Sequence, residues 1–189
     1  MQDHRLNGGK WLSESLKKNM EQILHDKLGA TAPVVQDILD YRIFLDHKGI
    51  ADQGLSLQRV KDCLREYLQT TDNACFVADY EHVMQQSLPP VLRDRLLMGY
   101  HPRRSGDLIV VPEPGYYDFG TWSSPTGTTH GEWNPYDAHI PLLFYGWKVP
   151  HGETSREVHI TDIAPTICQM LHIQQPNACV GEAIGINER

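Results

Sequence analysis

Two short, continuous apolar runs constrain the fold of this chain more than any other feature of its sequence. Leu108–Val111 is bounded by Asp107 and Pro112, and Ile140–Tyr145 ends at Gly146. A strand with one wet face alternates apolar and polar residues, whereas a run that is apolar at every position predicts a strand covered on both faces. We therefore expect an α/β fold in which both runs are central strands of a helix-covered sheet.

The spacing of apolar residues predicts helices that can cover such a sheet. Leu16–Leu28 carries apolar residues every three or four positions, with Ser13 as the N-cap and Gly29 as the C-cap. Three further stretches with this spacing predict helices, which follow Ser56, span Pro90–Met98 and follow Thr161.

The segment between the first helix and the first apolar run predicts a compact α+β unit. Tyr41–Leu45 alternates like a strand, Lys48–Gly49 suits a turn, and Ala74–Ala78 suits a short strand. The succession of strand, helix, strand and helix could pack on itself. From Arg103 onward the composition shifts toward Gly, Pro, Thr and aromatic residues.

Length and charge exclude several classes of protein. A chain of 189 residues with 40% apolar and 22% charged residues is a folded globular protein. A net charge of −7 argues against binding to a nucleic-acid backbone, which depends on cations. No apolar run approaches the roughly 20 residues of a membrane helix, and Met1–Arg5 does not open a signal peptide. Cys63, Cys75, Cys168 and Cys179 fit two local disulfides or four buried thiols equally well.

Few of the histidines and arginines lie in sequence motifs that are typical of a catalytic or ligand-binding site. The sequence lacks HExxH, GxSxG, Walker and GxGxxG patterns. His130 stands in the small-residue loop Thr126–Gly131, where glycines let the backbone approach an ion and hydroxyls can fix the imidazole tautomer. A hydrogen-bonded loop histidine is the alternative. Arg103 and Arg104 could meet a phosphate, but we favour a solvated or salt-bridged pair.

Asp137 and His139 are expected to lie on one face of an extended segment and to orient each other. We favour a structural role for the pair, in which a buried His139 anchors the loop over the sheet. The other histidines have no clustered partners and are interpreted as solvent or core residues: His4, His25, His47, His82, His101, His151, His159 and His172.

An ordered series of motifs in the second half of the chain resembles the C-terminal part of the alkaline phosphatase superfamily. The branch with the greatest resemblance is that of the zinc alkaline phosphatases related to nucleotide pyrophosphatase/phosphodiesterases. The motifs are Pro102–Asp107, Glu113–Gly115, Gly127–Gly131, Asn134–Gly146 and Thr161–Thr166. The resemblance implies that residues 1–33 are a helix and linker belonging to the core, that 34–102 are a peripheral α+β insertion subdomain, and that 103–189 are the C-terminal part of the core.

The resemblance implies a two-zinc site, a Thr or Ser nucleophile and a phosphoryl-enzyme intermediate in the complete chain. Two cations about 4 Å apart can hold the attacking and leaving oxygens in line. His130 matches a zinc ligand of the family, and Thr128, Thr129 and Asp137 are expected to surround and orient it. A periplasmic or secreted location is also implied, although the signal peptide is not in this chain.

The nucleophile and the other zinc ligands of the family find no match here. Asp3-His4 lacks the preceding strand and the following Gly of the family's Asp-His ligand pair. The resemblance therefore predicts a fragment that is inactive alone, binds zinc poorly and lacks its N-terminal catalytic half. We expect the strands Leu108–Val111 and Ile140–Tyr145 to be exposed and able to self-associate. The alternatives are a nucleotide pyrophosphatase/phosphodiesterase and a non-catalytic binding module that reuses the fold.

Overall fold

The computed structural model describes residues 8–11, 13–71, 73–118, 130–146 and 149–186. The chain divides into two compact units, Met1–Ile140 and Pro141–Arg189. We call them unit 1 and unit 2 and describe each by itself.

Unit 1 is built on a sheet whose described strands run in the order β2-β3-β5-β4. These strands are β2 (Val35–Leu39), β3 (Arg42–Leu45), β5 (Leu108–Pro112) and β4 (Ala74–Asp79), each antiparallel to its neighbours. The apolar run at 108–111 is therefore a central strand, as its sequence predicts. The expectation that it would be exposed is wrong, because β3 and β4 pair with its two edges and helices cover its faces.

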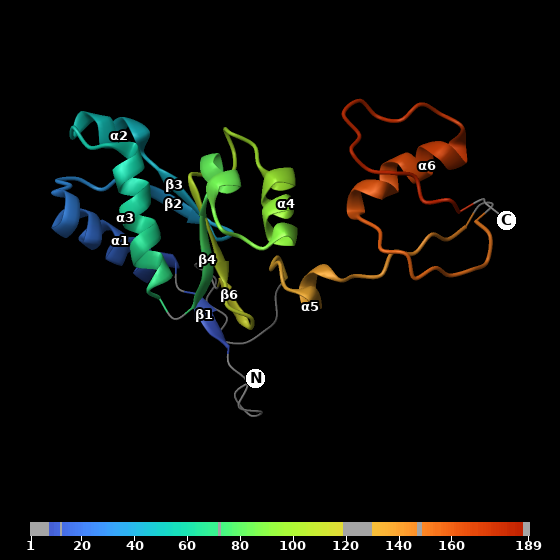
Figure 1. Cartoon of the computed structure of the whole chain (residues 1–189), viewed down its shortest axis with the longest axis horizontal. Helices are drawn as coiled ribbons and strands as arrows, with labels where there is room; N and C mark the ends of the chain where they lie inside the picture. The colour runs from blue at the N-terminus through green and yellow to red at the C-terminus, as the bar shows by residue number, and fades with distance from the viewer. Residues whose placement is uncertain (1–7, 12, 72, 119–129, 147–148, 187–189) are drawn as a thin grey trace. The chain divides into compact units, whose positions relative to one another are not determined.

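Helices cover both faces of this sheet, and Figure 1 shows α1 (Ser13–Leu28) and α3 (Leu57–Gln69) on the side opposite α4 (Pro90–Gly99). Leu108 and Val110 belong to the larger apolar cluster, which includes α1 and α3 residues, whereas Val111 belongs to the smaller one beside α4. Successive side chains of a strand point to opposite faces. A strand between two helical layers must therefore be apolar at every position, and the predicted α/β class is confirmed.

Two predicted capping residues, Ser56 and Gly29, are confirmed, whereas Ser13, the predicted N-cap, is the first residue of α1. The Ser56 hydroxyl accepts a hydrogen bond from the Arg59 N–H and opens α3, and Gly29 takes a positive φ of 71° directly after α1. The inner face of α3 is fully buried through Val60, Leu64 and Leu68.

The strand predicted at Tyr41–Leu45 is confirmed as β3, and one local prediction beside it is corrected by the structure. β3 forms a hairpin with β2, and Asp40 and Tyr41 form the turn of this hairpin with positive φ values of 46° and 64°. Lys48 and Gly49 lie inside α2 (His47–Asp52) instead of a turn, because the Asp46 carboxylate accepts from the Gly49 N–H and begins a helix.

The remaining strands of unit 1 form a parallel pair, β1 (Gly9–Trp11) with β6 (Tyr116–Asp118). β5 pairs with β3 and β4 across the predicted boundary at residue 102, so residues 34–102 and β5 share one sheet. The assignment of 34–102 to an insertion in a larger core stays a prediction.

Unit 2 contains the short 3-10 turn η3 (Ile160–Asp162) and the helix α6 (Ile163–Leu171). Pro165 lies in the first turn of α6, as its position predicts. The run Ile140–Tyr145 is not a strand, and the side chains of Ile140, Leu143 and Tyr145 are exposed. A strand requires a hydrogen-bonded neighbour. The predicted exposure of this run is therefore confirmed, whereas its prediction as a central strand is wrong.

All four cysteines lie within the described residues and are free thiols, so the disulfide alternative is not adopted. Burial raises the pKa of Cys63 and of Cys75 above the ordinary thiol value. Within the described residues, no helix is both long and apolar enough to cross a membrane.

Candidate functional site

The loop that begins at His130 is organised by a single carboxylate. Asp137 lies in the one-turn helix α5 (Pro135–Ala138) and accepts hydrogen bonds from the N–H groups of Gly131 at 2.7 Å and Glu132 at 2.8 Å. Gly131 adopts a φ of 111°, which an L side chain rarely adopts. The chain therefore folds back directly after His130, and Asp137 fixes the backbone from which that imidazole projects.

A second set of polar contacts ties this loop to the turn after β5. The Gly115 N–H donates to the Tyr136 hydroxyl at 2.9 Å, and that hydroxyl donates to the Glu132 carboxylate. The Asn134 amide, which is buried, donates to both oxygen atoms. Burial and the bond to Glu132 raise the pKa of Tyr136 above its ordinary value of 10.0. The phenol therefore stays protonated and can donate.

The His130 loop also contacts other elements of unit 1. Trp133 makes an edge-to-face contact with Phe76 on β4, with ring centroids 6.2 Å apart. The Arg95 guanidinium of α4 donates to the Trp133 carbonyl at 2.7 Å. The His130 loop is therefore attached to β4, α4 and the β5–β6 turn, which is the kind of support that a positioned functional residue requires.

The predicted pairing of Asp137 with His139 is wrong. The two residues lie in and just after α5, not in an extended segment, and Asp137 faces the backbone after His130 instead. His139 is exposed, so it is not the buried anchor that was expected. Thr128 and Thr129 lie outside the described residues, and their predicted role stays untested.

The residues of the described chain do not by themselves fit a zinc site. His130 is exposed and belongs to no group of three or more ligand-type side chains among the described residues. A zinc site takes three or four protein ligands. A role for His130 as a ligand therefore requires further ligands from outside the described part of the chain.

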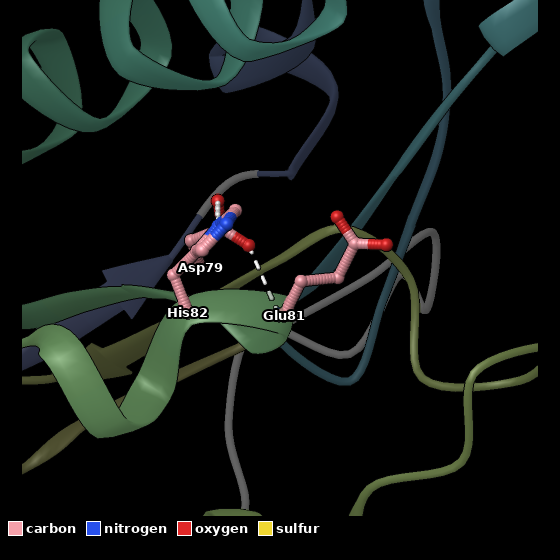
Figure 2. Close-up of side chains that lie close together, drawn as sticks. All are labelled: Asp79, Glu81 and His82. Carbon is pink, nitrogen blue, oxygen red and sulfur yellow. Dashed lines mark hydrogen bonds and ion pairs between the residues drawn. The ribbon is translucent and has the colours of Figure 1, made fainter.

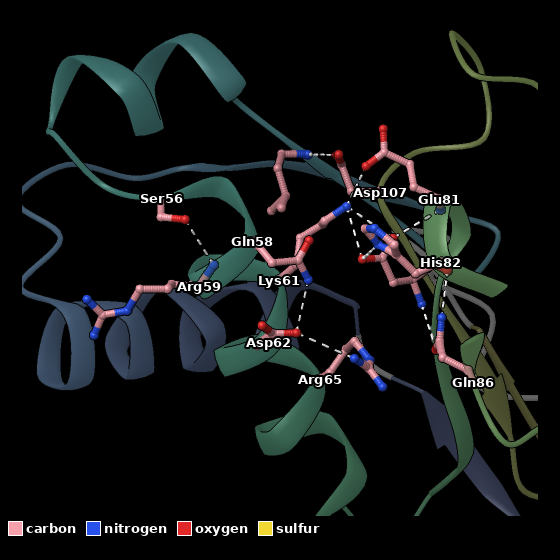
Figure 3. Close-up of polar contacts among 12 residues, drawn as sticks. Ser56, Gln58, Arg59, Lys61, Asp62, Arg65, Glu81, His82, Gln86 and Asp107 are labelled. Atoms are coloured by element: carbon pink, nitrogen blue, oxygen red, sulfur yellow. Dashed lines mark hydrogen bonds and ion pairs between the residues drawn. The ribbon is translucent and has the colours of Figure 1, made fainter. Parts of the chain in front are cut away.

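A different cluster of ligand-type groups stands at the end of β4. Asp79, Glu81 and His82 lie within reach of a common ion, and Figure 2 shows them around the start of η2 (Tyr80–Gln85). However, a protein cation already occupies this position. The buried Lys61 ammonium lies 3.0 Å from the Asp79 carboxylate. It also lies 2.8 Å from the Glu81 carboxylate, and Figure 3 labels the two residues of this second contact. The cluster is therefore a salt-bridge network and carries no metal assignment.

The electrostatics of this network follow from its bonds. Burial opposes the charge on Asp79, but hydrogen bonds from His82 and Lys61 outweigh it and hold the Asp79 pKa below 3.8. Burial likewise opposes the charge on Lys61, and the two carboxylates outweigh it and raise the Lys61 pKa above 10.5. Both groups are charged near neutral pH, and each is the counter-ion of the other.

Sequence reasoning missed two histidine contacts. His82 Nδ1 lies 2.9 Å from the Asp79 carboxylate, and His47 Nε2 lies 2.6 Å from that of Asp107. Asp79 and His82 are three positions apart, and this spacing could have indicated the first contact. The partners of the second contact are 60 positions apart, so no local pattern indicates it. Arg103 and Arg104 are exposed, in agreement with the solvated alternative.

Comparison with known proteins yields relatives three times as long as this chain. No family model matches. Alkaline phosphatase PafA from Elizabethkingia meningoseptica is 36% identical over 184 residues, which are 97% of this chain and 33% of PafA. A protein named calcium-transporting ATPase from Myroides odoratus is 36% identical over 96% of this chain and 33% of its own length. Alkaline phosphatase PhoV from Synechococcus elongatus is 35% identical over 78% of this chain and 26% of its own length.

The fold agrees with these sequence matches. The crystal structure of wild-type PafA superposes on 97% of this chain with a TM-score of 0.89 at 36% identity, and the match covers 34% of that structure. A substituted variant of PafA gives a TM-score of 0.87. The chain spans about one third of the length of the relatives it matches. In sequence and in fold, this chain belongs to the alkaline phosphatase superfamily.

Proposed function

We propose that this chain is the C-terminal part of a zinc-dependent alkaline phosphatase that hydrolyses phosphomonoesters, and that it acts only within a longer polypeptide. The observation that carries the proposal is the His130 loop. It is held by Asp137, Tyr136 and Trp133, and it stands in a chain 36% identical to PafA over 97% of its length. A periplasmic or secreted location is part of the same proposal.

In this proposal His130 binds one zinc ion of the complete protein, together with ligands from the polypeptide that the chain lacks. Asp137 contributes by holding the backbone of Gly131 and Glu132, which fixes where the imidazole points. The zinc supplies Lewis acidity toward the phosphoryl group when it is bound. The part of the chain that the structure describes supplies positioning for this chemistry.

The test is a chimera in which this chain replaces the matching third of PafA. We expect the chimera to hydrolyse an aryl phosphate monoester. We expect His130→Ala to lower zinc content and to reduce turnover about a hundredfold or more, because a metal site depends on each of its ligands. His139→Ala is the matched control, since His139 is another exposed histidine nine positions further along the same loop, and it should retain both zinc and turnover.

Two outcomes contradict the proposal. A His130→Ala chimera with full zinc content and unchanged turnover contradicts the assignment of His130 as a zinc ligand. A chimera that hydrolyses an aryl phosphate diester in preference to the monoester contradicts the proposed substrate class and supports the phosphodiesterase alternative.

A further inference from the structure

Tyr41 adopts a backbone conformation that few residues other than glycine tolerate. With Asp40 it forms the turn between β2 and β3, and both residues have positive φ values, 46° for Asp40 and 64° for Tyr41. Such turns are usually built from Asn and Gly, because an L side chain at positive φ crowds its own backbone. A bulky residue keeps this conformation only where its surroundings hold it there. The contacts of Tyr41 must therefore offset this strain.

Tyr41 joins three strands outside its own hairpin. Its side chain is 9% exposed, and its ring makes an edge-to-face contact with Trp11 on β1, with ring centroids 5.5 Å apart. Its carbonyl accepts a hydrogen bond from the Val110 N–H of β5 at 3.0 Å. Its hydroxyl accepts from the Asp118 N–H at 2.8 Å, at the end of β6 and 77 positions further along the chain. A phenylalanine could make the ring contact, so the hydroxyl serves the bond to Asp118.

β6 is held at both ends by tyrosine hydroxyls. Among the described strands, this three-residue strand pairs only with β1, in a two-stranded sheet (Figure 1). A pair of short strands is marginally stable by itself. At the end of β6 the Asp118 N–H donates to Tyr41, and just before its start the Gly115 N–H donates to Tyr136. The position of β6 therefore depends on both hydroxyls.

The second of these tyrosines belongs to the His130 loop. The Tyr136 hydroxyl donates to the Glu132 carboxylate. The Glu132 N–H donates to Asp137, the carboxylate that also holds Gly131. A continuous series of contacts thus runs from the β2–β3 turn, along β6, to the backbone directly after His130.

Electrostatics place the Tyr41 hydroxyl near the same groups. Burial raises the pKa of Tyr41 from 10.0 to about 12, the hydrogen bond from Asp118 opposes this shift, and the Glu132 carboxylate and Tyr136 reinforce it. A charge affects a pKa through space mainly over short distances. Tyr41 is therefore neutral near neutral pH, and its hydroxyl shares a polar environment with Glu132 and Tyr136.

We propose that Tyr41 is a positioning residue of the phosphatase site, and that it acts through β6 and Tyr136 to fix the backbone from which the His130 imidazole projects. The inference rests on the proposed function in one respect, the role of His130 in catalysis. The connection between Tyr41 and the His130 loop lies within the 189-residue chain, so it can be tested there without a metal.

The first experiment measures amide hydrogen exchange by NMR in the 189-residue chain. Tyr41→Phe keeps the ring and removes the acceptor of the Asp118 N–H. We expect exchange at the Gly131 and Glu132 amides to become about tenfold faster, which is the size of effect that the loss of one hydrogen bond produces. The Leu64 amide, in the buried part of α3, should exchange at an unchanged rate.

Tyr67→Phe is the matched control, because Tyr67 is a half-buried tyrosine of α3 whose hydroxyl has no hydrogen bond within the described residues. It should alter exchange at neither Gly131 nor Glu132. Tyr136→Phe breaks the same series of contacts at its other end, and it should fold because Tyr136 is 62% exposed. In a Tyr136→Phe background, Tyr41→Phe should not accelerate exchange at these two amides further, because the connection is already broken.

The second experiment measures how turnover by the PafA chimera depends on zinc after treatment with a chelator. We expect Tyr41→Phe to raise the zinc concentration that restores half of the turnover about tenfold, because loss of the support behind a metal-binding histidine weakens metal affinity. Turnover at saturating zinc should recover, which a general loss of stability would not allow. Tyr67→Phe should leave the zinc dependence unchanged.

Several results overturn the inference. Unchanged exchange at Gly131 and Glu132 in Tyr41→Phe shows that Tyr41 holds β6 alone. Equal acceleration at these amides and at Leu64 shows that Tyr41 serves only overall stability. Fully additive effects of Tyr41→Phe and Tyr136→Phe show that the two tyrosines act separately, and an active chimera whose zinc dependence ignores Tyr41→Phe contradicts the positioning role.

The two proposals fail in different ways. If exchange in the 189-residue chain changes as expected but the unsubstituted chimera does not hydrolyse phosphate esters, the proposed function is contradicted. The connection from Tyr41 to the His130 loop is then still supported.

Discussion

Lys61 and Asp79 are the only ion pair among the described residues in which both side chains are fully buried, each at 1% exposure. Removing two charges from water costs several kcal/mol, and their mutual attraction and hydrogen bonds offset that cost. Asp79 also accepts from the Glu81 N–H at 3.0 Å, so the pair joins α3 to the end of β4 and the start of η2. The energetic consequence of losing one partner is therefore large.

We expect Lys61→Met to lower the free energy of unfolding by about 3–5 kcal/mol, because the substitution leaves the Asp79 carboxylate buried without its counter-ion. Urea denaturation of the 189-residue chain measures the change. Lys48→Met is the control, since the Lys48–Asp52 pair is exposed, and it should cost less than about 1 kcal/mol. If Lys61→Met and Lys48→Met lowered the free energy of unfolding equally, the buried Lys61–Asp79 pair would be no more important for stability than an exposed pair.

The same pair predicts how stability depends on pH. The folded-state pKa of Asp79 lies below 3.8, so its contribution is complete above that value and is lost as the pH falls through the folded pKa. The folded-state pKa of Lys61 lies above 10.5, so its contribution is complete below that value and is lost as the pH rises through the folded pKa. We expect a plateau in melting temperature between these limits. Asp79→Asn should flatten the acid limb, and an acid limb identical in the variant would contradict this origin.

At the scale of elements, unit 1 and unit 2 are stabilised by different means. In unit 1, α1, α3 and α4 bury apolar side chains against the two faces of one sheet. In unit 2, the clasp formed by Asp162 and Thr166 holds the start of α6 to the segment around 182–184. Unit 2 should therefore respond to the loss of hydrogen bonds more than to changes in packing.

We expect Asp162→Ala to release the segment around Glu182 while leaving unit 1 intact. The substitution removes the acceptor of two backbone N–H groups, which should cost the clasp about 1–3 kcal/mol. Hydrogen exchange at the Glu182 and Ile184 amides measures the effect, and both should lose protection. Glu153→Ala, an exposed change in the same unit, should alter neither amide. Unchanged protection in Asp162→Ala would show that other contacts hold the segment.

At the scale of the whole molecule, the chain spans about one third of the length of the relatives it matches and carries one candidate ligand, His130. His130 is supported by contacts from several elements, but the described residues do not complete a zinc site around it. Zinc affinity requires several ligands held together. The isolated chain and the longer protein should therefore differ qualitatively in activity.

We expect the isolated 189-residue chain to show no hydrolysis of an aryl phosphate, even with excess zinc, because the ligands and nucleophile implied by the family resemblance are absent. The measurement is turnover by the purified chain with and without a chelator. Activity that the chelator abolishes would show that this chain contains a complete site.

The sequence alone determined the elements whose signals are local. The caps at Ser56 and Gly29 set helix ends, and the apolar run at Leu108–Val111 identified a central strand, because capping and two-sided burial depend on neighbouring residues. The order of motifs also identified the superfamily and singled out His130. These inferences needed no knowledge of distant contacts.

Only the tertiary structure decided what depends on partners far along the chain. Asp107 and His47 meet across 60 positions, and Lys61 reaches Asp79 from another element. Asp137 accepts a hydrogen bond from the Gly131 N–H and does not pair with His139, because the segment forms the helix α5 and is not extended as expected. Ile140–Tyr145 has the same composition as a central strand but is not one here. Hydrogen-bonded neighbours define a strand, and a sequence shows that a segment can pair but not whether its partner is present.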